Sequence, residues 1–172
     1  MRNRLPHRGE FMLAVCLTFI AATAMAADFS KGLITVTTPW LRATPNGAPV
    51  AGGYMTIVNK GAEPDRLIGG SVDFAGKTEV HQMAMSNGVM TMRDLPGGLV
   101  VGPGATVELK PSSFHLMFLD LKHQLKQGDT ASGSLTFEKA GAIPVQFTIE
   151  SMGAQSGPAQ SDTPKKMDMP MH

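Results

Sequence analysis

The stretch KTEVHQMAMSNGVMTMRDL, residues 77–95, consists of two alternating runs of residues around a central Asn87-Gly88 pair. An Asn-Gly pair between two such runs predicts a two-residue type I′ β-hairpin, because both turn positions require positive φ angles. That turn sets three cross-strand pairs, namely Ser86 with Val89, Met85 with Met90, and Met83 with Met92. The twofold period of a strand then places five side chains on one face: His81, Met83, Met85, Met90 and Met92.

Short apolar runs separated by turn residues continue on both sides of this hairpin, over residues 31–152. The expected strands cover residues 34–36, 54–58, 77–85, 89–95, 106–109, 114–121, 135–138 and 145–149. No stretch of ten residues carries a convincing helical period. Strands at this spacing indicate an all-β domain, built as an antiparallel sandwich or barrel.

The composition excludes several classes of function. The chain has 172 residues, enough for one domain with a real core. Its net charge of +1 provides no basic field for nucleic acid, and single Tyr and Trp residues provide no base-stacking platform. No nucleophile–base pair or carboxylate dyad occurs at a recognisable spacing, so we expect no enzymatic activity.

The N-terminus has the pattern of a secretory signal. Positively charged residues at 2–8 precede an apolar run at 11–22, and Ala-Met-Ala at 24–26 fits a cleavage site. We therefore expect residues 1–26 to be removed, with the folded domain at 27–152 and no membrane span left in the mature protein. The apolar run itself is short for a membrane span.

Cys16, the only cysteine, lies within the apolar run. A lipid anchor on Cys16 is the alternative to a cleaved signal, but Val15 is bulky where a small residue is expected. After cleavage the chain has no thiol, which excludes a disulfide scaffold, a catalytic cysteine and a cysteine-ligated metal.

A second group of histidine and methionine lies in the run Phe114-His115-Leu116-Met117-Phe118. In a strand the Phe and Leu side chains form the core face, so His115 and Met117 project together from the other face. Alone, each His could be structural and each Met could be core. Together they form a soft nitrogen and sulfur donor set, and thioethers select Cu(I) over Zn(II) and hard cations.

At these residues the sequence resembles the periplasmic PCuAC-type copper chaperones. The matching stretches are residues 79–83, 88–93, 107–111 and 115–118, and the resemblance covers roughly residues 30 to 150. The family signature is a His, a Met about ten residues later, and a His-x-Met pair just over twenty residues beyond. In this chain the signature falls on His81, Met92, His115 and Met117.

By this resemblance those four residues are Cu(I) ligands in a cupredoxin-like Greek-key β-sandwich. Some members have a Met beside the first His, whereas Met83 lies two residues away and is an auxiliary candidate. Met90 is a nearby rival to Met92. The resemblance implies delivery of copper by a monomer to cytochrome c oxidase, with a Sco-type thiol protein as a frequent partner.

The C-terminal segment 153–172 changes composition and is expected to be a flexible, disordered tail. It ends with four potential copper ligands, Met167, Met169, Met171 and His172. Family members with a Met/His-rich tail use it as an additional copper site. Cu(II) could also bind there, through His172 and the terminal carboxylate.

Two other functions remain open from the sequence. A protein that only sequesters copper needs the same site as a chaperone, and a metal-free immunoglobulin-like module needs only the sandwich. A blue-copper electron carrier does not fit, because that site needs a cysteine thiolate.

Overall fold

The computed structural model describes residues 28–158, which form eleven β-strands and contain no α-helix. The strands are β1 (Asp28–Lys31), β2 (Ile34–Arg42), β3 (Val50–Asn59), β4 (Asp65–Val72), β5 (Lys77–Ser86), β6 (Val89–Asp94), β7 (Leu99–Val101), β8 (Thr106–Leu109), β9 (Phe114–Leu119), β10 (Thr130–Phe137) and β11 (Gly141–Glu150). The predicted all-β fold is confirmed. Within the described residues, no helix is long and apolar enough to span a membrane.

The predicted signal segment at 1–26, with Cys16, lies outside the described residues. So do the four candidate tail ligands at 167–172. These parts of the sequence analysis stay predictions.

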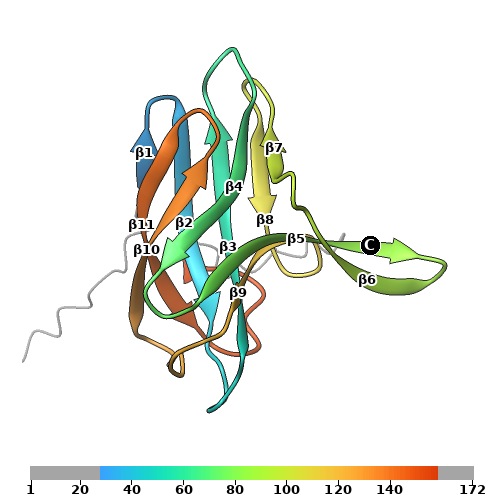
Figure 1. Ribbon diagram of the computed structural model, residues 1–172, viewed down its shortest axis with the longest axis vertical. Helices are drawn as coiled ribbons and strands as arrows, with labels where there is room; N and C mark the ends of the chain where they lie inside the picture. Colours follow the sequence, from blue (N-terminus) through green and yellow to red (C-terminus); the bar gives the residue numbers. More distant parts are fainter. Residues whose placement is uncertain (1–27, 159–172) are drawn as a thin grey trace, which may run out of the picture.

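The strands hydrogen-bond in the order β6-β5-β9-β3-β2-β11-β10-β4-β7, with β1 added to β2 and β8 added to β3. Only β2 and β11 are parallel among these pairs. Some strands that are distant in the sequence are neighbours in the sheet, for example β5 and β9. This is the pattern of Greek-key connections. The path has two free ends within the described chain, so the sheet is an open sandwich (Figure 1) and not a closed barrel.

The core lies between the two parts of this sheet. Phe118 from β9 meets Phe147 from β11 with ring centroids 5.7 Å apart, although β9 and β11 are not neighbours in the sheet. Phe74, in the loop before β5, packs on Phe118 at 5.1 Å. Each buried side chain of this size contributes about 2–3 kcal/mol. Because Phe118 packs into the core, it defines the inner face of β9. The side chains that alternate with Phe118 therefore lie on the outer face of that strand.

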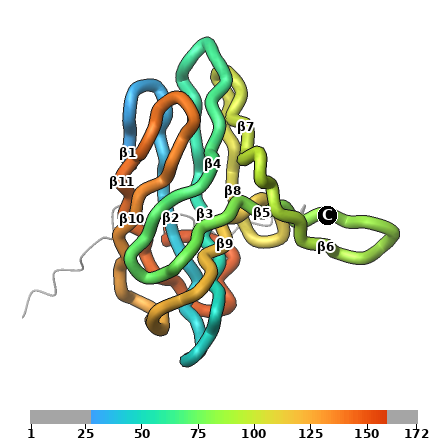
Figure 2. The backbone as a smooth tube through the Cα atoms, in the orientation of Figure 1, coloured from blue at the N-terminus to red at the C-terminus, as the bar shows by residue number. Residues whose placement is uncertain are grey.

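The β5–β6 hairpin departs from the body of the sandwich. Figures 1 and 2 show it extending sideways, beyond the point where β5 leaves β9. β5 pairs with β9 only from Lys77 to Gln82, and β6 pairs only with β5. The inner half of β5 is therefore part of the sheet, whereas the outer half and β6 form a two-stranded arm.

Residues 153–158 follow β11 and lie against the domain. The Nε atom of Arg42 donates a hydrogen bond of 2.8 Å to the carbonyl oxygen of Ala154. Gly157 is buried, and a Cβ atom there would lie 2.6 Å from the ring of Trp40. The chain thus stays on the domain for six residues beyond the expected start of the flexible tail at Gly153, because Arg42 and Trp40 provide it with a docking surface.

Candidate metal site

The hairpin has the register predicted from its turn. Asn87 and Gly88 have φ angles of 51° and 79°, as a type I′ turn requires. The observed pairs include Ser86 with Val89, Met85 with Met90, and Met83 with Met92. The prediction that these methionines share one face with His81 is therefore confirmed.

The neighbouring strand β9 brings the second histidine to the first. His81 and His115 are directly paired across β5 and β9, and their ring centroids are 5.7 Å apart. Leu116 and Phe118 are fully buried in the core, as expected for the inner face of β9. His115 and Met117 consequently lie on the outer face, the same face as His81.

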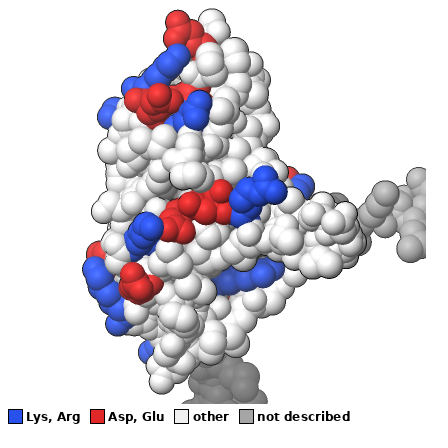
Figure 3. Space-filling model, turned by 45° about the vertical axis from the view of Figure 1, so that its right-hand side comes forward, with Lys and Arg blue, Asp and Glu red and all other residues white. Residues whose placement is uncertain are grey.

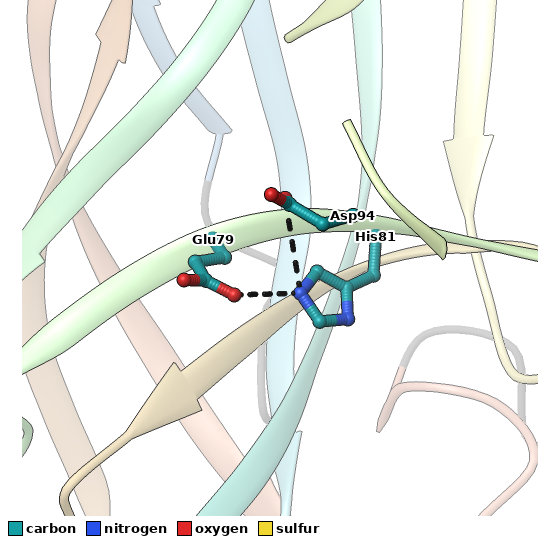
Figure 4. Close-up of side chains that lie close together, drawn as sticks. All are labelled: Glu79, His81 and Asp94. Atoms are coloured by element: carbon teal, nitrogen blue, oxygen red, sulfur yellow. Dashed lines mark hydrogen bonds and ion pairs between the residues drawn. The ribbon is translucent and has the colours of Figure 1, made fainter. Parts of the chain in front are cut away.

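One ring nitrogen of His81 is left free for a ligand. Its Nε2 lies 2.8 Å from Oε2 of Glu79 and 3.9 Å from Oδ1 of Asp94 (Figure 4). A carboxylate only accepts, so Nε2 carries the proton and donates to Glu79. The other nitrogen, Nδ1, is buried and has no hydrogen-bond partner. The lone pair of His81 is therefore on a buried atom that no protein group satisfies.

Glu79 is kept in its charged form by its neighbours. Hydrogen bonds from Lys77, and then from His81, lower the pKa of its carboxyl group. From the sequence, Glu79 is expected to be a solvated charge beside the hairpin, with a supporting role beside a ligand as the lesser alternative. The spacing favours that alternative, because residues 79 and 81 lie on the same face of a strand. Asp94 of β6, which is paired with His81 of β5, has a half-exposed side chain.

His115 is prepared in a similar way by the backbone. It is only 5% exposed, and its Nδ1 donates a hydrogen bond of 3.2 Å to the carbonyl oxygen of Ser113. Burial lowers the pKa of His115. The hydrogen bond with Ser113 opposes this effect, whereas the charge of His81 lowers the pKa further. The ring is therefore neutral at neutral pH, with the lone pair on Nε2 available to a metal.

The predicted sulfur ligands lie around a groove beside these rings. Met83, Met92, Met117 and His115 line it, with a volume of about 380 Å³. His81 is placed at its side by the contact with His115. The structure thus brings together all four residues of the signature and the auxiliary candidate Met83. Met85 and Met90 lie farther along the hairpin and do not line the groove.

The floor of the groove contains residues that the sequence analysis did not single out. Tyr54 stacks on Trp40 with ring centroids 4.4 Å apart, and lies 6.4 Å from the ring of His115. Burial raises the pKa of Tyr54, opposed by the charge of Arg42, whose guanidinium lies 5.6 Å from the Tyr54 ring. Gln155 also lines the groove, so the segment after β11 contributes to its wall.

The donor set suits a soft ion. It consists of two imidazole nitrogens and up to three thioethers, with no carboxylate among the residues that line the groove. Thioethers favour Cu(I), whereas Zn(II) sites are built with thiolate, imidazole or carboxylate. The orphaned Nδ1 of His81 fits this use, because metal binding would satisfy a buried atom that otherwise has no partner.

Comparison with known proteins identifies a family and a relative. Residues 34–149 match the family model LpqE-like, described as "Putative lipoprotein LpqE-like". The "Putative lipoprotein Lxx21020" of Leifsonia xyli is 25% identical over 138 residues, which is 80% of this chain and 82% of that protein. A family and a relative described as lipoproteins fit an exported protein.

Solved structures with a similar fold include PCuAC domains with and without copper. The apo PCuAC domain of PmoF2 superposes with a TM-score of 0.64 and 27% identity, over 76% of this chain and all of that domain. Its copper-bound form gives 0.63 and 28%, over 73% and 98%.

The solution structure of CuI-DR1885 from Deinococcus radiodurans gives a TM-score of 0.57 and 25% identity, over 76% of this chain and 83% of that one. The cupredoxin-like fold expected from the sequence is confirmed, and the copper-bound neighbours support a copper-binding, chaperone-like role. The chain belongs to the LpqE-like family, and its solved structural neighbours support the relationship to PCuAC-type copper chaperones that the sequence suggested.

Proposed function

We propose that this protein binds one Cu(I) ion at the groove and passes it to an acceptor protein. The proposed ligands are His81, Met92, His115 and Met117, with Met83 as an auxiliary donor. The observation that supports this most directly is the pairing of His81 with His115, each with one ring nitrogen unpaired beside a groove lined by thioethers.

The charge of the groove also favours a monovalent ion. Its lining has no acidic side chain and includes Arg42, one of whose terminal nitrogens is buried without a partner. A divalent cation would bring more positive charge close to that guanidinium than Cu(I) would. Arg42 therefore disfavours Cu(II) and Zn(II) more strongly than Cu(I).

The exposure of the ligands suits transfer. His115 is nearly buried, whereas Met92 is 51% exposed on the outer strand of the hairpin. An acceptor can replace the exposed thioether first while the imidazoles still hold the ion. Such stepwise exchange avoids releasing free Cu(I), which is the property that separates a carrier from a storage protein.

The proposal places this transfer in the periplasm, after removal of residues 1–26. The acceptors expected are the copper centre of cytochrome c oxidase or a Sco-type thiol protein, because a thiolate binds Cu(I) more strongly than a thioether does. The protein acts as a monomer and without enzymatic turnover. At the tail, Met167, Met169, Met171 and His172 form an additional site, for Cu(I) and also for Cu(II).

X-ray absorption and a transfer assay test the proposal. The reduced copper complex of the full chain should show a mixed shell of nitrogen and sulfur, and Cu(I) should pass to an apo acceptor faster than it dissociates into a chelator. The His81→Ala/His115→Ala double variant is the control and should lose the nitrogen scattering of the main site. A shell of nitrogen and oxygen alone would exclude this site, and stable retention in the presence of an acceptor would indicate sequestration instead.

A further inference from the structure

The outer half of the hairpin exposes thioethers that the groove does not use. Met85 is 66% exposed and Met90 is 46% exposed, and the two are directly paired across β5 and β6. They lie on the same face as the pair Met83 and Met92, one alternation farther from the histidines. The hairpin therefore carries two successive cross-strand methionine pairs on the face that leads to the groove.

This arrangement is not explained by packing. Residues with this exposure contribute little to a core, and β6 is an edge strand with all six residues exposed. Edge strands are usually protected by charged side chains, yet residues 82–92 contain no Asp, Glu, Lys or Arg. In Figure 3 the charged side chains lie on the body and at the base of the hairpin, and its projecting part is uncharged.

The other face of the same arm has a different composition. Ala84 is paired with Thr91, whose hydroxyl donates to the carbonyl oxygen of Ala84, and Gln82 is paired with Arg93. That face also carries the pair Ser86 and Val89 and has no methionine, so a general preference for methionine in the hairpin does not account for the pattern. The thioethers are confined to the face shared with the histidines.

The geometry of a direct cross-strand pair fits a two-coordinate Cu(I) ion. Opposed Cβ atoms lie about 5 Å apart, and each Met side chain adds two flexible bonds before its sulfur. Two sulfurs bound to one ion lie roughly 4.5 Å apart, given a metal–sulfur bond of about 2.3 Å. Successive pairs along the strands are about 7 Å apart, so an ion could pass from one pair to the next.

We propose that Met85 and Met90 form a second, weaker Cu(I) site on the arm, one step outward from the groove. It goes beyond the proposed function, since it adds a binding site with two thioethers and no imidazole. Because its ligands are exposed, this site exchanges copper with the surroundings faster than the groove does. It is the outer site through which a copper ion enters or leaves the groove.

Methionine methyl NMR on the full chain tests the site directly, with Ag(I) as a redox-inert substitute for Cu(I). Beyond the first equivalent, the ε-methyl signals of Met85 and Met90 should shift together. The signal of Met152, which is 61% exposed and lies outside the hairpin, is the control and should stay in place. If the Met85 and Met90 signals move no more than that of Met152, the proposed site does not exist.

A second measurement separates this site from the groove. The M85L/M90L variant keeps the size and apolar character of both side chains, so it should fold normally and bind about one equivalent less Ag(I), whereas M152L should lose none. In the His81→Ala/His115→Ala variant the Met85 and Met90 shifts should persist. Their loss there, or an unchanged capacity of M85L/M90L, would overturn the inference. If Ag(I) shifts the Met85 and Met90 signals of the native chain but leaves the Met117 signal in place, the groove site is wrong and the site on the arm stands.

Discussion

The Oε2 atom of Glu79 lies 2.8 Å from Nε2 of His81, while Nδ1 of the same ring is buried without a partner. The carboxylate thus selects the tautomer in which the unsatisfied nitrogen keeps its lone pair. Carboxylate contacts of this kind orient a ligating imidazole and make it a stronger donor. In this protein Glu79 positions His81 and does not itself need to touch the ion.

We therefore expect Glu79→Gln to weaken Cu(I) binding by about 10- to 100-fold. A Gln side chain can accept the hydrogen bond only through a neutral oxygen, so His81 is held less firmly and is a weaker donor to the ion. Competition with a Cu(I) chelator measures the affinity. Glu63→Gln removes the same charge from the exposed ion pair with Lys139 and should leave affinity unchanged. Equal effects of the two variants would mean that Glu79 acts only through overall charge.

Removal of either histidine should cost more than removal of either methionine. We expect a loss of about 100-fold or more for His81→Ala or His115→Ala, and of about tenfold for Met92→Leu or Met117→Leu. The physical reason is that imidazole is the stronger donor and that Met83, which lines the same groove, can substitute for a lost thioether. Chelator competition across the four variants checks the order. A larger loss for Met92→Leu than for both histidine variants would contradict it.

Gly52 permits the close packing of the groove floor. A Cβ atom at this position would lie 2.7 Å from the hydroxyl oxygen of Tyr54, and Tyr54 is held by its stack on Trp40. Gly52→Ala should therefore lower the free energy of unfolding by about 1–3 kcal/mol and disturb copper binding. Thermal unfolding measures the first effect and chelator competition the second.

Two further variants make this prediction specific. Tyr54→Phe removes the clashing oxygen, so Gly52→Ala should be tolerated better in that background. Gly153→Ala, where a Cβ atom would have open space, should have little effect. A stable Gly52→Ala variant with native affinity would show that the Tyr54 ring moves freely.

The carboxylate of Asp65 should make stability depend on pH. Burial alone would raise the pKa of Asp65, but backbone N–H groups of Lys139, Arg66 and Ala140 donate to it and lower the pKa overall. Its contribution is therefore present above the unfolded value of about 3.9 and is lost as pH falls through the folded pKa.

Asp65→Asn should thus cost about 2 kcal/mol at neutral pH, and the difference from the native chain should shrink below a pH of about 4. Urea denaturation between acid and neutral pH measures this difference. Asp129→Asn, at an exposed position, is the control. A cost that stays constant down to strong acid would mean that the charge of Asp65 is not the cause.

Two truncations separate the tail from the segment that docks on the domain. Deleting residues 159–172 should leave stability and the groove site intact and should lower total copper capacity. Deleting 153–172 should also lower the melting temperature, because it removes the acceptor for Arg42 and uncovers Trp40. Calorimetry and copper titration measure the two effects. If the protein that lacks residues 159–172 binds as much copper as the full chain and transfers it at the same rate, the tail has no role.

The strands that sequence analysis missed have a physical explanation. β4 has the sequence DRLIGGSV, and its two glycines have low strand propensity. The structure shows why glycine stands there, since a Cβ atom at Gly70 would lie 2.7 Å from the carbonyl oxygen of Ser134 in β10. β2 was expected to end at residue 36 but continues past Pro39 to Arg42, with a shift of register after Thr37. Contacts with neighbouring strands outweigh local propensity at both places.

What the sequence determined by itself was the local geometry. The Asn87-Gly88 turn sets the pairing of the hairpin, and the twofold period assigns His115 and Met117 to the face opposite Leu116 and Phe118. Both follow from backbone stereochemistry over a few residues, so no knowledge of distant contacts was needed.

Only the tertiary structure decided which strands lie side by side. The pairing of His81 with His115 depends on β5 and β9 becoming neighbours, although the two residues lie in different segments of the chain. The tautomer of His81 and the burial of His115 follow from that same assembly. Strand order in a Greek-key sandwich is set by the collective burial of the core and not by local pattern. The local pattern therefore gave the site only in two halves, and the family resemblance was needed to join them.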